Sequence, residues 1–155
     1  MKKKISICLI LFVLLPMISM AEEIIKVGVL APLDIAVGKG LRNAAEMAAE
    51  EINASGGILG KKIELVFADT KLKPVVGAYE YTRLATQEKV ATVLGTFASE
   101  VALAVLEQVP KYKVPFLTGS ASPEITEKIK QNYDSLKYAF KVFHNGYELA
   151  DFSSE

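Results

Sequence analysis

Short apolar runs alternate with longer amphipathic segments along this chain, and this alternation constrains its fold more than any other feature of the sequence. The β-branched run Ile24 to Leu30 is followed by Gly38 to Ala54, where apolar residues recur at helical spacing. The helical face that we expect to be buried consists of Leu41, Ala44, Ala45, Ala48 and Ile52, and the opposite face carries Glu46, Glu50 and Glu51. Gly56 and Gly57 should end this helix, because glycine readily adopts the left-handed conformation found at helix C-termini.

The same order continues through the rest of the chain. Further strands are predicted at 63–67, 91–94, 114–117 and 138–143. Helices are predicted from Pro74 to about Gln87, from Ser99 to about Val109, and in a short segment capped by Ser122. The expected inner face of the first of these helices is Val75, Ala78, Tyr79, Thr82 and Ala85. Strands that alternate with helices predict one α/β domain, in which a parallel sheet has helices on both faces.

Residues 1–21 have the features of an export signal. Lysines follow Met1, a continuous apolar run extends from Ile5 to Met17, and the small residues Ser19 and Ala21 stand where a signal peptidase cleaves. We therefore expect cleavage near Ala21, a periplasmic or secreted product, and a folded domain made of residues 22–155. The alternative is a membrane anchor, but the apolar run is shorter than the roughly 20 residues that span a bilayer.

Cysteine content and charge narrow the class of protein. Cys8 is the only cysteine and lies inside the predicted signal, so the mature chain would have no thiol for a disulfide, a lipid anchor or a metal. Removing Lys2, Lys3 and Lys4 with the signal leaves 15 basic residues against 18 acidic residues, a net charge of −3. This balance does not favour nucleic acid as a partner.

Three loops are the candidates for a binding site. In open parallel sheets, ligands bind beyond the carboxyl ends of the strands, where helix N-termini offer unpaired backbone N–H groups. Residues 32–38, 95–99 and 118–122 should meet at this edge. The Ser99 hydroxyl, at a predicted helix start, suits a carboxylate, and Gly119 and Ser120 offer open backbone and a hydroxyl. The alternative is that Ser99 and Ser122 only cap their helices.

The sequence lacks recognisable catalytic or nucleotide-binding motifs. The segment Gly38 to Gly40 has neither the Ser or Thr nor the upstream glycine of a P-loop, and no dinucleotide fingerprint follows the first strand. His144 is the only histidine, and the chain has no nucleophile elbow for it to serve, so we expect a surface or loop histidine. Asp34, Asp69 and Glu100 are dispersed. We therefore predict no enzyme activity, no cofactor and no metal site.

A set of motifs in fixed order covers nearly the whole mature chain. The set comprises Ile24–Leu33, Gly38, Ala48–Asn53, Gly56–Leu65, Asp69 ahead of Pro74, Val93–Gly95 ahead of Ser99, and Val114–Phe116 ahead of Ser122–Thr126. Together these stretches closely resemble the branched-chain amino acid (Leu/Ile/Val) binding proteins of ABC transporters. The resemblance implies the type I periplasmic binding protein fold, of which this chain would form an incomplete first lobe.

The resemblance also implies roles for individual residues. A serine that matches Ser99 holds the carboxylate of the amino acid in that family. A small-residue loop that matches Gly119, Ser120 and Ala121 lies beside it, with the Gly119 carbonyl accepting a hydrogen bond from the ammonium. Val37 stands where an aromatic residue can line the pocket. Ala121 replaces a residue that is commonly threonine in that family.

Full family members are more than twice as long, and their second lobe supplies an acidic partner for the ammonium and much of the side-chain pocket. The implied function is that of a solute-binding component, truncated here, which binds an aliphatic or branched-chain amino acid or a similar small polar solute. The implied partners are ABC permease subunits in the inner membrane. The alternatives are a ligand-sensing domain of a receptor or regulator with the same fold, or a non-functional gene fragment. A secreted α/β enzyme would require a nucleophilic Ser99.

Overall fold

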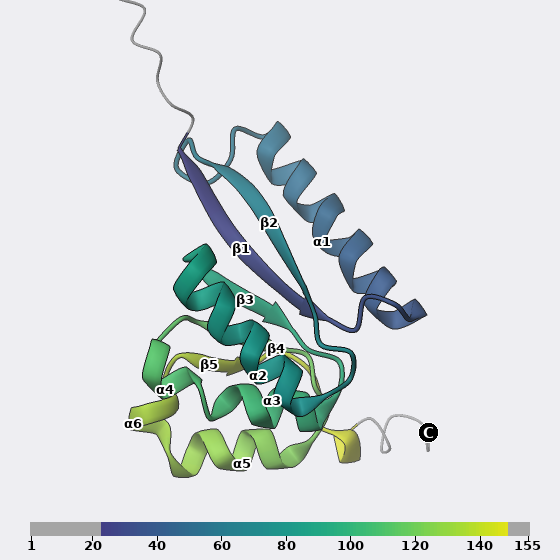
Figure 1. Ribbon diagram of the computed structural model, residues 1–155, viewed down its shortest axis with the longest axis vertical. Helices are drawn as coiled ribbons and strands as arrows, with labels where there is room; N and C mark the ends of the chain where they lie inside the picture. Colours follow the sequence, from purple (N-terminus) through teal and green to yellow (C-terminus); the bar gives the residue numbers. More distant parts are fainter. Residues whose placement is uncertain (1–22, 149–155) are drawn as a thin grey trace, which may run out of the picture.

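Five parallel strands form one sheet in the computed structural model, which describes residues 23–148 (Figure 1). The strands are β1 (Ile24–Ala31), β2 (Lys62–Asp69), β3 (Thr92–Gly95), β4 (Phe116–Thr118) and β5 (Ala139–Lys141). Their order across the sheet is β2-β1-β3-β4-β5, and every neighbouring pair is parallel. The predicted parallel α/β fold is confirmed, whereas the predicted export signal lies outside the described residues.

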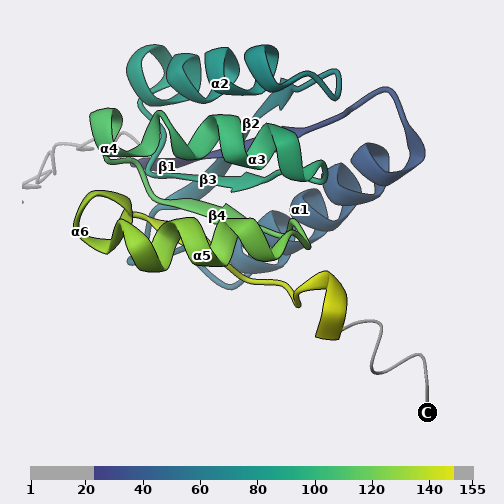
Figure 2. The same cartoon turned by 90° about the horizontal axis from the view of Figure 1, so that it is seen from below.

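The helices occupy the two faces of the sheet unequally. They are α1 (Ala36–Ala54), α2 (Pro74–Arg83) with its π-helical extension η1 (Leu84–Glu88), α3 (Ser99–Leu106), α4 (Val109–Tyr112), α5 (Pro123–Gln131) and α6 (Tyr133–Leu136). Figures 1 and 2 show α2, α3 and α5 on one side of the sheet and α1 on the other. The helix predicted over 99–109 is interrupted after Leu106, and Pro110 lies in the first turn of α4, where its missing N–H removes no hydrogen bond. The helix α6 was not predicted from the sequence.

The core lies between the sheet and the helices α2, α3 and α5. Tyr81 and Phe116 are its largest fully buried side chains, and their ring centroids lie 6.0 Å apart in an edge-to-face arrangement. The Tyr81 hydroxyl donates a 2.7 Å hydrogen bond to the Val114 carbonyl, just before β4. Leu106 and Ile125 extend the same core along α3 and α5. Burial of this kind is the main stabilising contribution in a domain of this size.

The predicted inner face of α2 is only partly correct. Ala78, Thr82 and Ala85 are half-buried. Val75 and Tyr79 are 81% and 61% exposed, whereas Tyr81 and Leu84 are fully buried. Tyr79 and Tyr81 are two positions apart and therefore lie on nearly opposite sides of the helix. The stripe that contains Tyr81 faces inward because it buries a large ring that also finds an acceptor in the Val114 carbonyl.

The expected buried face of α1 is mostly wrong. Leu41 and Ala45 are half-buried, but Ala44, Ala48 and Ile52 are exposed. Ala49, which was not predicted, is the buried alanine of this helix. The reason is the position of the helix, which packs against β1 and β2 and leaves the strands β3, β4 and β5 open on this side (Figure 1). Among the described residues, no other helix covers that part of the sheet.

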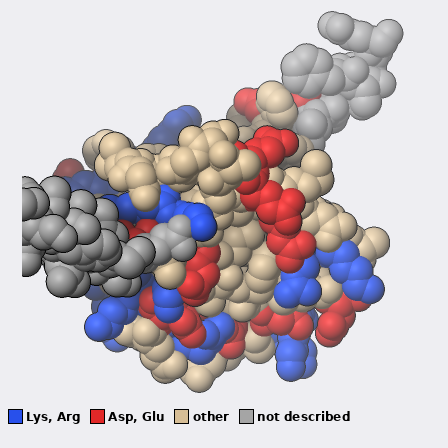
Figure 3. Space-filling model, turned by 90° about the horizontal axis from the view of Figure 1, so that it is seen from above, with Lys and Arg blue, Asp and Glu red and all other residues tan. Residues whose placement is uncertain are grey.

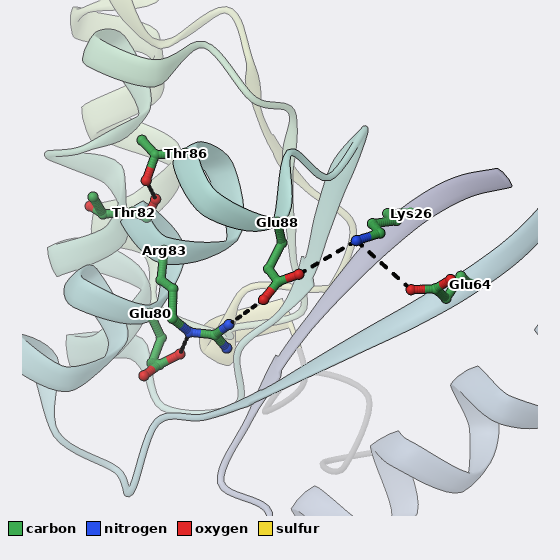
Figure 4. A network of polar contacts seen from close by, with 7 residues as sticks. All are labelled: Lys26, Glu64, Glu80, Thr82, Arg83, Thr86 and Glu88. Atoms are coloured by element: carbon green, nitrogen blue, oxygen red, sulfur yellow. Dashed lines mark hydrogen bonds and ion pairs between the residues drawn. The ribbon is translucent and has the colours of Figure 1, made fainter.

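A group of ion pairs links the strands to α2 and η1 away from the carboxyl edge. Lys26 lies 3.6 Å from Glu88 and 4.0 Å from Glu64, so it joins β1 to η1 and to β2 (Figure 4). Arg83 donates to Glu80 at 2.7 Å and to Glu88 at 2.9 Å. These side chains are partly exposed, so each pair contributes modestly to stability.

Charged side chains of both signs lie next to one another over much of the face drawn in Figure 3. Within residues 23–148, no helix is long and apolar enough to span a membrane.

Candidate functional site

The sheet order brings the three candidate loops together at one edge. β1, β3 and β4 are consecutive in the sheet, and Leu30, one residue before the end of β1, pairs with Gly95, the last residue of β3. The loops that follow these strands therefore leave the sheet side by side. This arrangement confirms the predicted convergence of residues 32–38, 95–99 and 118–122.

Two glycines allow these loops to approach the backbone closely. A Cβ added at Gly38, at the start of α1, would lie 1.8 Å from the Pro32 carbonyl oxygen. Gly95 has a φ of +126°, and a Cβ there would lie 1.9 Å from the Leu30 carbonyl oxygen. Any larger residue at either position would have to displace backbone, so both loops depend on glycine.

Ser99 is the first residue of α3, and the residue at the N-cap is Ala98. The expected capping role of Ser99 is therefore wrong, because capping belongs to the residue before the first helical turn. Ser99 is half-buried, and its hydroxyl forms no hydrogen bond to another residue of the described chain. It lies at the positive end of the α3 dipole, where the first backbone N–H groups lack helical acceptors. The hydroxyl is thus available to a ligand.

Ser122 provides the contrast. It is the N-cap of α5, as predicted, and its hydroxyl accepts a 3.2 Å hydrogen bond from the Glu124 backbone N–H. The two serines at helix starts on this edge therefore differ, since Ser122 is used by its own helix and Ser99 is not.

The loop after β4 has one open position and one closed position. Gly119 is exposed, whereas Ser120 is fully buried. The Ser120 hydroxyl donates to the Thr96 carbonyl at 3.1 Å and accepts from the Thr118 hydroxyl at 3.1 Å. Ala121 is half-buried, and its carbonyl accepts from the Gly146 N–H at 2.9 Å. Within this loop, Gly119 is the residue whose backbone is most open to a ligand.

Val37 and Gly119 line the same hollow, which has a volume of about 470 Å³. Thr96 and Phe97, from the loop after β3, complete its end at the carboxyl edge. Phe97 is 54% exposed. It was not predicted as a site residue, although a large apolar side chain between a strand and a helix start is a signal for a residue that lines a binding site. Ser99 does not line this hollow but begins the helix that follows the same loop. The site thus places polar groups beside an uncharged, partly apolar wall.

Acidic residues near this edge have structural roles or face solvent. Asp69 Oδ1 accepts hydrogen bonds from the backbone N–H groups of Leu33 at 3.1 Å and Lys71 at 2.9 Å, which fixes the loop after β1 to the end of β2. Asp34 is exposed. Among residues 23–148, no cluster of His, Cys, Asp and Glu side chains could hold a metal ion. The predicted loop position of His144 is confirmed, and its side chain is exposed.

Two bacterial proteins are similar to this chain in sequence. The "Leu/Ile/Val-binding protein homolog 7" of Brucella suis is 36% identical over 125 residues, which are 77% of this chain and 31% of the relative. An "Amino acid binding protein" of Pseudomonas aeruginosa is 39% identical over 85 residues, which are 54% of this chain and 23% of the relative. The chain therefore spans about a third or less of the length of these relatives.

A solved structure gives the same result at the level of the fold. The branched-chain amino acid transporter substrate-binding protein LivJ of Streptococcus pneumoniae, solved in complex with isoleucine, superposes with a TM-score of 0.71 at 30% identity. The superposition covers 79% of this chain and 34% of that protein. A profile of the periplasmic binding protein family matches residues 24–150. The resemblance to branched-chain amino acid binding proteins is confirmed, and the chain belongs to the periplasmic binding protein family.

Proposed function

We propose that this chain forms part of the substrate-binding component of an amino acid ABC transporter. The observation that carries the proposal is the state of Ser99, whose hydroxyl has no hydrogen-bond partner in the described chain and lies at the N-terminus of α3. A hydroxyl and backbone N–H groups at the positive end of a helix are suited to a carboxylate. Ligand binding involves no covalent change of the bound molecule in this proposal.

The proposed ligand is an aliphatic or branched-chain amino acid. Its carboxylate accepts hydrogen bonds from Ser99, and its ammonium donates to the Gly119 carbonyl. Val37 and Phe97 provide an uncharged wall for the side chain, and both are accessible, at 38% and 54% exposure. Names of the relatives, which refer to leucine, isoleucine and valine, support this ligand class.

Ser120 and Ala121 take an indirect part in the proposed site. Ser120 is buried and holds the loops after β3 and β4 together through its bond to Thr96, so it positions Gly119 relative to Ser99. Ala121 contributes backbone to the same loop. In this proposal the chain acts in the periplasm after cleavage near Ala21 and delivers its ligand to permease subunits in the inner membrane.

The proposal is tested by an NMR titration of the ¹⁵N-labelled mature chain, residues 22–155, with L-leucine. The expected result is a saturable shift of the Ser99 and Gly119 amide signals at millimolar ligand, because this chain presents one side of the binding site. The matched control is isopentylamine, which is leucine without its carboxylate and should leave the Ser99 signal unchanged. Equal shifts of the Ser99 signal with the two compounds, or none with L-leucine, L-isoleucine and L-valine, would reject the proposal.

A further inference from the structure

Asn145 lies in the turn that follows β5, and its carboxamide uses every hydrogen-bonding position that it has. The residue is buried, with 8% exposure. Its amide oxygen accepts from the Thr126 hydroxyl of α5 at 3.3 Å and from the Lys141 ammonium of β5. Its amide nitrogen donates to the Tyr147 hydroxyl at 3.0 Å and to a Glu148 carboxylate oxygen at 3.4 Å. A carboxamide has two acceptor and two donor positions, so all four are occupied.

The turn that contains Asn145 is attached to the candidate site. The N–H of Gly146, the next residue, donates to the Ala121 carbonyl at 2.9 Å. Ala121 belongs to the loop after β4, in which Gly119 is exposed. The hydrogen bonds of Asn145 to α5 and β5 therefore hold a turn that supports one side of this loop.

Asn145 is the one asparagine among the four of the chain that precedes a glycine. The backbone nitrogen after an asparagine can attack the side-chain carboxamide carbon, and glycine hinders this attack least because it has no Cβ. The fold does not require glycine at position 146. Its φ is not positive, and an added Cβ would meet only the Ala121 carbonyl oxygen, at an ordinary distance of 3.8 Å.

We propose that Asn145 and Gly146 form a deamidation site that the fold keeps unreactive, and that deamidation releases this turn from the loop after β4. The Gly146 nitrogen forms a bond to the Asn145 carboxamide carbon, and the bond between that carbon and the side-chain nitrogen breaks. Ammonia leaves with the proton of the Gly146 nitrogen, and a cyclic succinimide remains. Water then opens the ring at either carbonyl and gives aspartate or isoaspartate.

The folded turn opposes the first step in two ways. The Gly146 N–H is engaged by the Ala121 carbonyl, and the Asn145 carboxamide is held by four partners in a buried position. The attacking nitrogen and the carboxamide carbon can meet only when the turn opens. Local opening costs free energy, so the folded chain should react only in the fraction of time that the turn is open.

Deamidation would disrupt the turn once it has occurred. The Asn145 N–H donates to the Glu148 carboxylate at 2.7 Å and lowers the pKa of Glu148 below its ordinary value, so Glu148 is ionised at neutral pH. An aspartate at position 145 would place a negative charge where the carboxamide nitrogen now donates to Glu148. Lys141 would be attracted to the new charge, but both donors of the carboxamide are lost. Isoaspartate would also insert a side-chain carbon into the main chain and shift Gly146 relative to Ala121.

The reaction is tested by incubating the mature chain at mildly alkaline pH with and without urea, with peptide mass spectrometry as the readout. Asn43 and Asn132, which are exposed and precede larger residues, are internal references. In urea, Asn145 should deamidate faster than either reference, and in the folded chain about tenfold or more slower than in urea. Gly146→Ala should abolish the fast reaction in urea and leave cooperative unfolding intact. Equal rates with and without urea, or an Asn145 rate in urea no higher than the references, would overturn the proposal.

Thr126→Val tests the protection by the fold. It removes one donor to the carboxamide oxygen and keeps the size of the side chain, so Asn145 in the folded chain should deamidate at least about threefold faster. Thr86→Val is the matched control, because the Thr86 hydroxyl donates to the Thr82 carbonyl one helical turn away. An unchanged rate in Thr126→Val, or an equal acceleration in both variants, would overturn the proposed protection.

The release of the turn is measured by amide hydrogen exchange. Asn145→Asp should raise the exchange rate of the Gly146 amide by about tenfold or more, whereas Asn132→Asp should leave it unchanged. If Asn145→Asp does not unfold cooperatively, Asn145→Ser, which loses the partners without adding a charge, is measured with the same expectation. Unchanged Gly146 exchange in a cooperatively folded variant would overturn the release. Only an effect on ligand binding rests on the proposed function, and because these measurements need no ligand, their failure is distinct from a failure to bind L-leucine.

Discussion

The hydroxyl of Ser120 donates a 3.1 Å hydrogen bond to the carbonyl of Thr96, and this bond joins the loops that follow β4 and β3. Both residues are buried, with exposures of 0% and 2%. Thr118 supports the same bond, because its hydroxyl donates to Ser120 and accepts from the Ser120 N–H at 3.2 Å. The relative position of Gly119 and Ser99 therefore depends on a buried hydroxyl that does not reach the ligand surface.

Replacing Ser120 should destabilise the fold. Ser120→Ala removes the hydroxyl that donates to the Thr96 carbonyl and accepts from the Thr118 hydroxyl, and we expect a loss of about 1–3 kcal/mol in the free energy of unfolding. Urea denaturation measures this loss. The control is Ser55→Ala, since the exposed Ser55 hydroxyl also donates to a backbone carbonyl, that of Glu51 at 2.9 Å, and should change stability by less than about 0.5 kcal/mol. Equal effects at the two serines would contradict the structural role of Ser120.

Gly95→Ala should be far more damaging than the same change at Gly40. The added Cβ at Gly95 would meet the Leu30 carbonyl at 1.9 Å with φ at +126°, so we expect a loss of more than about 3 kcal/mol. Gly40 lies inside α1 with no atom within 4 Å of an added Cβ, and Ala there should stabilise the helix by about 0.5–1 kcal/mol. Thermal unfolding of the two variants should shift the midpoint in opposite directions. A similar shift of the midpoint in both variants would show that stability does not depend on the close approach of Gly95 to the Leu30 carbonyl.

Asn53 completes the outer edge of β2. Its amide nitrogen donates to the Ile63 carbonyl at 2.9 Å, and its amide oxygen accepts from the Ile63 N–H at 2.7 Å. Asn53→Asp keeps the acceptor but replaces the donor with a second acceptor facing a carbonyl, so stability should fall by about 1–3 kcal/mol at pH 7. Asn43→Asp, on an exposed turn of the same helix, is the matched change and should have little effect in the same denaturation experiment. A comparable loss at both sites would mean that the added charge, and not the lost donor, is responsible.

Burial raises the pKa of Tyr81 well above its ordinary value near 10. The folded state therefore retains the phenolic proton at pH values where the unfolded state loses it. Stability from this group is fully present below about pH 10 and falls above it, by up to about 1.4 kcal/mol per pH unit. Denaturation between pH 9 and 11 should show a weaker decline for Tyr81→Phe than for the unmodified chain. Parallel declines would show that Tyr81 is free to ionise in the folded state.

The sequence predicted the alternation of strands and helices correctly because periodicity and glycine positions are local signals. It was only partly correct for the inner face of α2, where both Tyr79 and Tyr81 are candidates and only packing against β4 selects Tyr81. It failed for the N-cap of α3, because Ala98 carries no capping side chain that a pattern could detect. The buried state of Ser120 depends on the carbonyl of Thr96, which is distant in sequence. Local spacing thus located the site loops, whereas contacts between loops decide which groups remain available.

The most direct test of the proposed site is a comparison of leucine affinity for the mature chain, Ser99→Ala and Ser122→Ala, measured by NMR titration. Ser99→Ala should weaken binding by about 1–3 kcal/mol, a factor of roughly 5 to 150, because a carboxylate loses a hydroxyl donor. Ser122→Ala should lower the stability of the chain by about 0.5–2 kcal/mol through loss of its cap and should leave the affinity unchanged. Unchanged affinity in Ser99→Ala, in a chain as stable as the unmodified one, would contradict the assignment of Ser99 to the ligand.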